Sequence, residues 1–260
     1  MNSFHQKYGP WALVTGASSG IGAEFCRQLA PKGINLVMVA RRKERMEQLA
    51  EELKNKHDVQ TKVIQADLSR NDFIQKLLPE ISSLEISLLV NNAGFGIRGA
   101  FLNSNLEIEL EMLDVNCRAP LILTHVIGRQ MLERKRGGII FISSVLGFIE
   151  TPYFANYAAS KAHNLYMGNA LWYELKHHGI DVLVLSPGTT KTEFGKVSGG
   201  NEIPLMKVEP VVGVALKKLG KKPSVVAGVH NRMFVLWLKL FPRRIMTVLL
   251  GSAMKKMIKN

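Results

Sequence analysis

Tyr157 and Lys161 are the residues whose types and spacing most clearly suggest chemistry. They are four positions apart in the segment Tyr-Ala-Ala-Ser-Lys, within a run of helical pattern, so both side chains fall on one face of a helix, one turn apart. A phenol with an ordinary pKa of ~10 is a reluctant acid at neutral pH, and a nearby ammonium makes its reversible deprotonation easier. The pair is therefore a candidate for proton transfer, although Tyr-x-x-x-Lys taken alone also occurs on solvated helix surfaces.

A serine hydroxyl lies shortly upstream of this pair. Ser143 and Ser144 end an apolar run that begins at Gly138, and Ser144 precedes Tyr157 by 13 residues. An apolar run of this length is typical of a buried strand. A hydroxyl at the end of such a strand could hold a substrate oxygen, which makes a purely solvated Tyr–Lys pair a weaker interpretation.

Alternating elements must position these residues. Short apolar runs that do not alternate are typical of strands buried on both faces, and they lie at residues 12–15, 36–39, 62–65, 88–90, 139–142, 182–185 and 225–227. Helical patterns separate them, for example at residues 21–29, 45–54, 107–134 and 155–176. This order predicts a single α/β domain with a Rossmann-like, doubly wound parallel sheet, in which ligands bind at the carboxyl ends of the strands. We assign residues 1–229 to a dinucleotide-binding catalytic domain and residues 230–260 to an apolar, basic helical appendage.

A glycine-rich segment follows the first predicted strand. Residues 15–22 read Thr-Gly-Ala-Ser-Ser-Gly-Ile-Gly. Glycines between a strand and a helix allow the backbone to approach a pyrophosphate, whose charge the helix N-terminus stabilises. No Lys-Ser/Thr follows the last glycine, which excludes a nucleoside-triphosphate P-loop. The residues expected to contact a dinucleotide here are Gly16, Ser18, Ser19, Gly20, Ile21 and Gly22.

The end of the second predicted strand indicates which dinucleotide is bound. An NAD-preferring protein usually has an acidic residue near this point for the ribose 2′-hydroxyl, whereas this chain has Arg41 and Arg42. Guanidinium groups pair with phosphate in a bidentate fork, so these arginines favour NADP(H) as the cofactor. The alternative is a solvated pair at the start of the helix that carries Lys43, Glu44 and Arg45.

Two further strand ends carry candidate cofactor contacts. Asp67 follows the third strand and could accept a hydrogen bond from adenine, cap the next helix, or do both. The fourth strand runs into Asn91-Asn92-Ala93-Gly94. The small residues there would let the backbone lie under a ribose while the Asn92 amide bridges strands, although the same sequence could be an ordinary turn.

In this order and spacing the motifs identify a resemblance to the short-chain dehydrogenase/reductase family over residues 10–195. The matching segments are residues 15–22, Asp67-Leu68, residues 91–94, Asn116, residues 142–144, residues 157–161 and Pro187-Gly188 followed by Thr192. The resemblance implies an NADP-preferring oxidoreductase that reduces a small-molecule carbonyl or oxidises the matching alcohol. It also implies a homo-oligomer formed through the helices at residues 107–134 and 155–176.

The resemblance further implies roles for individual residues. Ser144 would polarise the carbonyl, Tyr157 would act as general acid, and Lys161 would bind the nicotinamide ribose and lower the pKa of the tyrosine. Asn116 would hold a water that relays protons toward Lys161, unless it merely marks a helix kink. Pro187, Gly188 and Thr192 would contact the nicotinamide, and Leu68, Asn92, Ala93 and Gly94 would complete the cofactor site. An alternative function for the same fold is a dinucleotide-binding sensor or scaffold without turnover, which the complete Ser–Tyr–Lys set argues against.

The net charge of +13 is concentrated at one end of the chain. All 21 Asp and Glu residues lie within residues 1–209, and 11 of the 34 Lys and Arg residues lie within residues 210–260. The basic segment has apolar residues interleaved and matches no nucleic-acid-reading module, so we do not expect nucleic acid as a partner.

The basic tail has the composition of a surface-binding segment. A membrane-spanning helix over residues 233–254 would bury Lys239, Arg243 and Arg244 at ~2.5–3.5 kcal/mol for each central cation, and Pro242 would interrupt it. Two short amphipathic helices remain, with three possible roles: contact with anionic lipid, a subunit interface, or a cover over an apolar substrate cleft. All three favour a lipophilic substrate such as a 3-oxoacyl chain or a sterol-like ketone.

The remaining features concern compartment and substrate access. Cys26 and Cys117 are far apart without metal-type spacing, which fits buried thiols in a reducing compartment and no metal site. The N-terminus lacks the pattern of a secretory signal, so we expect a cytoplasmic protein, peripheral on a membrane if the tail binds lipid. Glycines and a proline within residues 193–205 suit a mobile lid over the substrate or a merely flexible connection.

Overall fold

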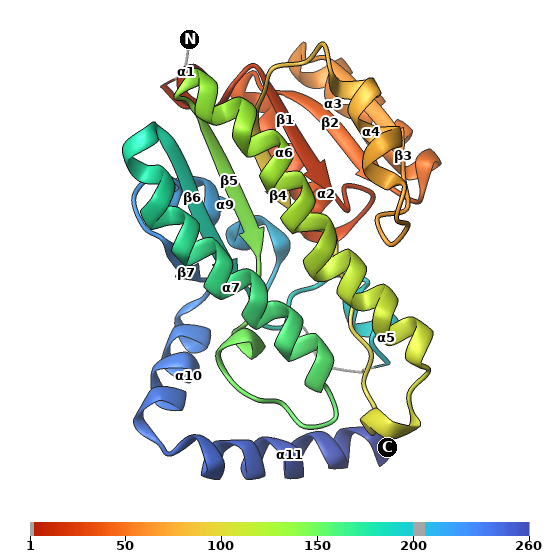
Figure 1. The fold of residues 1–260 in the computed structure, drawn as a ribbon, viewed down its shortest axis with the longest axis vertical. Helices are drawn as coiled ribbons and strands as arrows, with labels where there is room; N and C mark the ends of the chain where they lie inside the picture. Colours follow the sequence, from red (N-terminus) through yellow and green to blue (C-terminus); the bar gives the residue numbers. More distant parts are fainter. Residues whose placement is uncertain (1–2, 200–205, 260) are drawn as a thin grey trace.

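The computed structural model, which describes residues 3–199 and 206–259, has a seven-stranded parallel sheet with strand order β3-β2-β1-β4-β5-β6-β7 (Figure 1). The strands are β1 (Trp11–Thr15), β2 (Asn35–Ala40), β3 (Thr61–Gln65), β4 (Ile86–Asn91), β5 (Gly137–Ile142), β6 (Ile180–Ser186) and β7 (Ser224–Val226). Each predicted strand is present, and the doubly wound α/β prediction is confirmed. The order reverses between β1 and β4, where parallel sheets of this type open a crevice for a ligand.

Helices cover both faces of the sheet. They are α1 (Ser3–Tyr8), α2 (Gly20–Leu29), α3 (Lys43–His57), α4 (Phe73–Ile81), α5 (Leu106–Leu113), α6 (Ala119–Arg134), α7 (Ala155–Leu175), α8 (Phe194–Val197), α9 (Val208–Lys218), α10 (Val229–Leu240) and α11 (Arg243–Lys259). One core joins α2, α3 and α9 to strand residues such as Val14, and a second joins α4, α6 and α7 to strand residues such as Leu13. Successive strand residues thus enter opposite cores, which explains why the strands are apolar throughout.

The single helix predicted over residues 107–134 is wrong in one respect: a wide π turn, Asp114–Arg118, separates α5 from α6. Pro120 lacks the N–H that would bond to the carbonyl of Asn116 in a continuous helix. The amide of Asn164 on α7 donates to that carbonyl instead, at 2.9 Å. Asn116 is therefore a helix-kink residue, and its carbonyl is satisfied by a side chain from a neighbouring helix.

The C-terminal segment forms two helices on either side of Pro242, as expected, and α11 runs across the base of the molecule (Figure 1). Leu238 and Met246 are buried against Ile149, which anchors both helices to the segment after β5. Over residues 3–199 and 206–259, none of the helices has the length and apolar content to cross a membrane.

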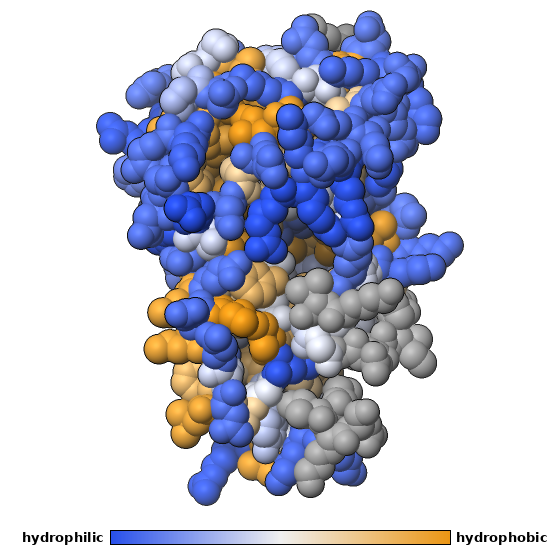
Figure 2. All heavy atoms as spheres, turned by 90° about the vertical axis from the view of Figure 1, so that its right-hand side faces the viewer, coloured by the Kyte–Doolittle hydropathy of each residue, from blue (hydrophilic) through white to orange (hydrophobic). Residues whose placement is uncertain are grey.

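The surface differs between the two ends of the molecule. On the face in Figure 2, hydrophilic residues dominate the upper half, where α3 and α4 lie, and apolar residues gather in the lower half around α5 and α11. Exposed apolar side chains in α5 and in the turn before it include Leu102, Leu106 and Leu110. The apolar surface therefore lies at the end of the molecule to which the strands point.

Candidate active site

A cavity of about 540 Å³ opens at the carboxyl ends of the central strands. All the predicted cofactor residues border it except Gly22, and Ser144 borders it as well. Gly22 lies in α2 just beneath, and Asn116 is fully buried behind Gly94. The topology thus brings segments from residue 16 to residue 254 to one place.

The glycine-rich turn has the shape that a dinucleotide needs. Gly16 adopts a left-handed φ of 66°, and a Cβ at Gly22 would lie 2.3 Å from the carbonyl oxygen of Gly16. Any side chain at these positions would strain or fill the turn. The open backbone next to the N-terminus of α2 fits the pyrophosphate of NAD(P).

Asn92 ties the fourth strand to the first. Its side-chain amide donates to the carbonyl of Thr15 at 2.8 Å. The Thr15 hydroxyl accepts from the backbone N–H groups of Asn92 and Ala93, each at 3.0 Å. The predicted bridging role of Asn92 is therefore present, and the bonds fix the backbone leading to Gly94 at the floor of the cavity.

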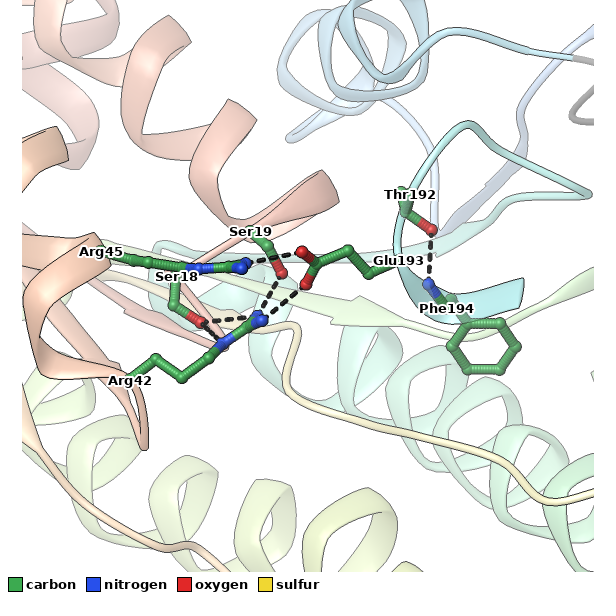
Figure 3. Close-up of polar contacts among 7 residues, drawn as sticks. All are labelled: Ser18, Ser19, Arg42, Arg45, Thr192, Glu193 and Phe194. Atoms are coloured by element: carbon green, nitrogen blue, oxygen red, sulfur yellow. Dashed lines mark hydrogen bonds and ion pairs between the residues drawn. The ribbon is translucent and has the colours of Figure 1, made fainter. Parts of the chain in front are cut away.

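Arg42 lies across the glycine-rich turn, as Figure 3 shows. Its guanidinium donates to the hydroxyls of Ser18 at 3.2 Å and Ser19 at 2.7 Å. It also contacts the carboxylate of Glu193 at 2.6 Å, and Arg45 contacts the other oxygen of that carboxylate at 2.6 Å. Hydrogen bonds from Arg45 and Arg42 lower the pKa of Glu193 to about 2. Arg42, Arg45, Ser18 and Ser19 thus form an anion-binding group. The anion that it binds in this structure is the carboxylate of Glu193.

The other two polar residues predicted at this end have different surroundings. Arg41 borders the cavity, but its guanidinium pairs with Glu111 of α5 at 3.2 Å. Asp67 accepts from the backbone N–H and the hydroxyl of Ser69 at 3.1 and 2.7 Å. It therefore stabilises its own turn, whereas Asp72 is the residue at the N-cap position of α4.

Tyr157 and Lys161 lie one turn apart on α7 and are both buried. The ammonium of Lys161 is 5.7 Å from the centre of the tyrosine ring and donates to the carbonyl of Ile142 at 3.1 Å. Burial lowers the pKa of Lys161 to about 8. At neutral pH Lys161 is therefore mostly protonated. Its positive charge near the tyrosine ring favours the ionised form of a phenol.

Two serines follow β5 and have separate contacts. The hydroxyl of Ser143 donates to the carbonyl of Lys161 at 2.7 Å and so fixes α7 against the strand. The hydroxyl of Ser144 accepts from the N–H of Leu146 at 3.2 Å, which orients it at the cavity wall. Both serines border the cavity, but the hydroxyl hydrogen of Ser143 is engaged by the carbonyl of Lys161, which makes Ser144 the better candidate for a ligand contact.

Asn116 connects the π turn to the segment after β4. Its side-chain oxygen accepts from the N–H of Phe95 at 3.0 Å, and its amide donates to the carbonyl of Phe95 and to the hydroxyl of Ser160, each at 2.9 Å. A Cβ added at Gly94 would lie 2.9 Å from the side-chain oxygen of Asn116 and 3.0 Å from the ammonium of Lys161. The side chains of Asn116 and Lys161 therefore both lie against Gly94. The proton relay between them stays a prediction.

The opposite end of the cavity is apolar. Tyr157 stacks on Phe154 with ring centres 4.4 Å apart, and Phe194 tilts against it at 5.2 Å. Met254 of α11 packs in the same cluster and borders the cavity. The predicted lid at residues 193–205 begins with the short helix α8, and its residues 200–205 lie outside the described part of the chain.

Several residues of this site were not predicted from the sequence, among them Arg45, Phe154, Phe194 and Met254. In the sequence Arg45 has the pattern of a solvated helix residue, and nothing local marks it as a partner of Glu193. The apolar, acid-free tail was a general signal that α11 could cover the cleft, but it did not indicate which methionine reaches the cavity.

Comparison with known proteins agrees with this geometry. The family model for short chain dehydrogenases matches residues 10–202. The chain belongs to the short-chain dehydrogenase family. Members of this family bind NAD(P), and the chain is an oxidoreductase that acts on a CH–OH or C=O group.

Individual relatives extend the similarity. A 7beta-hydroxysteroid dehydrogenase of Mediterraneibacter gnavus is 33% identical over 240 residues, covering 90% of this chain and 91% of the relative. A very-long-chain 3-oxoacyl-CoA reductase of Pyricularia oryzae is 40% identical over 190 residues, covering 71% of this chain and 57% of the relative. A solved structure from a study of 7beta-hydroxysteroid dehydrogenase stereoselectivity has a TM-score of 0.90 and 32% identity, and the match covers 96% of this chain and 100% of that one.

Proposed function

We propose that this short-chain dehydrogenase is an NADPH-dependent carbonyl reductase. The observation that carries the coenzyme choice is the position of Arg42, whose guanidinium lies on Ser18 and Ser19 of the glycine-rich turn with Arg45 beside it. Two guanidinium groups at the end of β2 suit a ribose 2′-phosphate, whereas a 2′-hydroxyl is usually held by an acid of that strand.

The chemistry of reduction follows from three side chains. NADPH, when bound, supplies the hydride. Tyr157 donates its phenolic proton to the carbonyl oxygen, and the Lys161 ammonium lowers the free energy of the phenolate that remains. Ser144 accepts from the N–H of Leu146, which leaves the hydrogen of its own hydroxyl for the substrate oxygen. In alcohol oxidation the same groups act in reverse.

A titration with the two coenzymes tests the first part of the proposal. We expect NADPH to bind the wild-type chain at least tenfold more tightly than NADH, because only NADPH offers a dianion to Arg42 and Arg45. Isothermal calorimetry at fixed ionic strength gives both dissociation constants directly. Equal affinities, or tighter binding of NADH, would refute NADP(H) preference.

We further propose a lipophilic carbonyl substrate, in the range of a 3-oxoacyl chain or a sterol-like ketone. Apolar side chains border the substrate end of the cavity, namely Phe95, Leu146, Phe154, Phe194 and Met254. Two relatives are named for a hydroxysteroid and for a very-long-chain 3-oxoacyl-CoA. Rates with a panel of steroid ketones, 3-oxoacyl esters and small polar ketones test this, and saturable turnover of the small polar ketones alone would contradict it.

We propose that α6 and α7 form a subunit interface between copies of the chain. The two helices cover the same face of the sheet side by side (Figure 1), and they expose Leu121 and Tyr166, with 48% and 70% of each residue accessible. Light scattering after size exclusion should give a dimer or larger assembly for wild type, and smaller particles for Leu121→Glu/Tyr166→Glu. A monomeric wild type would refute the interface, and Leu102→Glu controls for the added charge elsewhere.

We also propose that the exposed side of the tail, helices α10 and α11, contacts anionic lipid. Its exposed apolar residues are Val229, Met233, Leu236, Trp237, Leu240, Phe241, Ile245, Val248 and Leu249, and its exposed cations are Arg232, Arg243, Arg244, Lys255 and Lys256. Apolar residues with interspersed cations and no acids suit a negatively charged bilayer surface.

Flotation with phosphatidylserine-containing vesicles tests the lipid contact. Wild type should float with these vesicles and stay at the bottom with vesicles of phosphatidylcholine alone. Leu240→Glu/Val248→Glu should abolish flotation, and Leu102→Glu, which adds the same kind of charge outside the tail, should not. Wild type that fails to float with either vesicle would refute the proposal.

A further inference from the structure

Glu193 occupies the anion-binding group at the end of β2. Its carboxylate bridges Arg42 and Arg45, at 2.6 Å from each guanidinium, and reaches across the cofactor cleft from the segment that follows β6 (Figure 3). The arginines belong to the residues after β2, 148 and 151 positions away in sequence. This contact therefore spans the coenzyme half of the cavity.

The donors around Glu193 are those that the proposed function assigns to the coenzyme. Arg42 simultaneously holds the hydroxyls of Ser18 and Ser19, so the group combines two guanidiniums with two hydroxyls. A carboxylate and a phosphate make the same kind of bidentate contact with guanidinium. Glu193 and a ribose 2′-phosphate would compete for these donors, so we expect one to replace the other.

We propose that Glu193 is a specificity-determining residue for the coenzyme: its carboxylate stands in for the 2′-phosphate of NADP(H) and is displaced by it. The inference rests on the proposed NADP(H) preference and deepens it. The 2′-phosphate of NADP(H) gives Arg42 and Arg45 a new negatively charged partner in place of the Glu193 carboxylate. A coenzyme without this phosphate must either leave Glu193 in place or separate two ion pairs without compensation.

The displacement reaches the substrate half through the next residue. Phe194 tilts against Tyr157 at 5.2 Å between ring centres. Its N–H donates to the hydroxyl of Thr192 at 3.2 Å, and its carbonyl accepts from the N–H of Ser198 at 2.8 Å. Displacement of Glu193 removes the two ion pairs that hold the residue directly before Phe194, so in this proposal the 2′-phosphate also loosens α8 at the wall of the substrate pocket.

Nucleotide fragments separate this idea from the coenzyme preference itself. Adenosine 2′,5′-bisphosphate carries the phosphate without the nicotinamide, and adenosine 5′-monophosphate lacks it. In Glu193→Gln the bisphosphate should bind about three- to tenfold more tightly than in wild type, because two exposed ion pairs no longer compete. Binding of the monophosphate should be unchanged, and Glu51→Gln, with the same charge change on α3, should bind both fragments as wild type does.

Hydrogen exchange gives a second measurement that a merely structural role of Glu193 would not produce. In wild type, the bisphosphate should speed exchange of the amides at residues 194–198 and the monophosphate should not, whereas in Glu193→Gln exchange should be fast without any ligand. If wild type prefers the bisphosphate but Glu193→Gln binds it no more tightly, the displacement is refuted while NADP(H) preference stands. If wild type does not distinguish the two fragments, both proposals fall.

Discussion

The two halves of the cleft are built in different ways. The coenzyme half consists of backbone and charge: a glycine-rich turn, the Asn92 bridge between β1 and β4, and two arginines after β2. The substrate half consists of apolar side chains from distant segments, with Phe154, Phe194 and Met254 around Tyr157. Most of the proposed coenzyme half thus comes from short contiguous motifs at strand ends, whereas the proposed substrate half is lined by side chains that only the tertiary fold brings together.

Tyr157 and Lys161 lie between the two halves of the cleft. Among the variants below, loss of Lys161 should lower the rate of ketone reduction most. In Lys161→Met, kcat/KM for ketone reduction should fall about a thousandfold, because the charge that favours the phenolate is gone. Steady-state rates at saturating NADPH measure this. A fall of less than tenfold would contradict the role of the ammonium.

The same variant should be more stable at neutral pH. Burial lowers the pKa of Lys161 from 10.5 to about 8, a difference equivalent to roughly 3 kcal/mol against folding. Below pH 8 the lysine is protonated in both states and the cost is fully present. Between pH 8 and 10.5 the folded state loses the proton and the cost declines. Thermal unfolding should therefore show a higher Tm for Lys161→Met at pH 7 and a smaller difference at pH 10.

Arg42 tests the coenzyme half alone. Arg42→Ala should weaken NADPH binding by about tenfold or more, since a charge-assisted contact to phosphate is lost, and should change NADH binding little. Arg27→Ala on α2 removes a comparable exposed cation and should alter neither affinity. Equal weakening of both coenzymes would show that Arg42 supports the turn through Ser18 and Ser19 without reading the phosphate.

Met254 tests the substrate half alone. Met254→Ala should raise KM for a long-chain or steroid ketone by about fivefold, because it removes apolar surface from the cavity wall, and should leave the NADPH dissociation constant unchanged. Met233→Ala is the matched control, since Met233 is exposed on the neighbouring helix α10. If KM is unchanged for every ketone, α11 does not contact the substrate.

The pH profile should give the smallest effect. With a pKa of about 8, Lys161 loses most of its charge between pH 7 and 8.5, so kcat/KM for reduction should fall by about fourfold over that range. Rates measured in a constant-ionic-strength buffer series give the apparent pKa. A profile that stays flat to pH 9.5 would contradict a lysine pKa of about 8.

Local motifs explain how much of this molecule could be predicted from its sequence. The residues of the glycine-rich turn are contiguous, so strand–turn–helix order alone placed them at one strand end. The break before α6 carried a signal, Pro120, that the regular apolar pattern obscured. The sequence around Arg45 contains no signal of its role, because its partner Glu193 is 148 residues away. Met254 reaches the cavity only because α11 folds back under β5, and such a path is set by tertiary packing.

Turnover in Tyr157→Phe compared with wild type tests NADPH-dependent carbonyl reduction most directly, because the substitution removes a single oxygen atom. Wild type should consume NADPH with a lipophilic ketone, and Tyr157→Phe should bind NADPH with the same affinity while its kcat falls at least a hundredfold. Equal kcat values would contradict Tyr157 as the acid. Coenzyme binding without turnover of any carbonyl in wild type would indicate a dinucleotide-binding protein that is not a reductase.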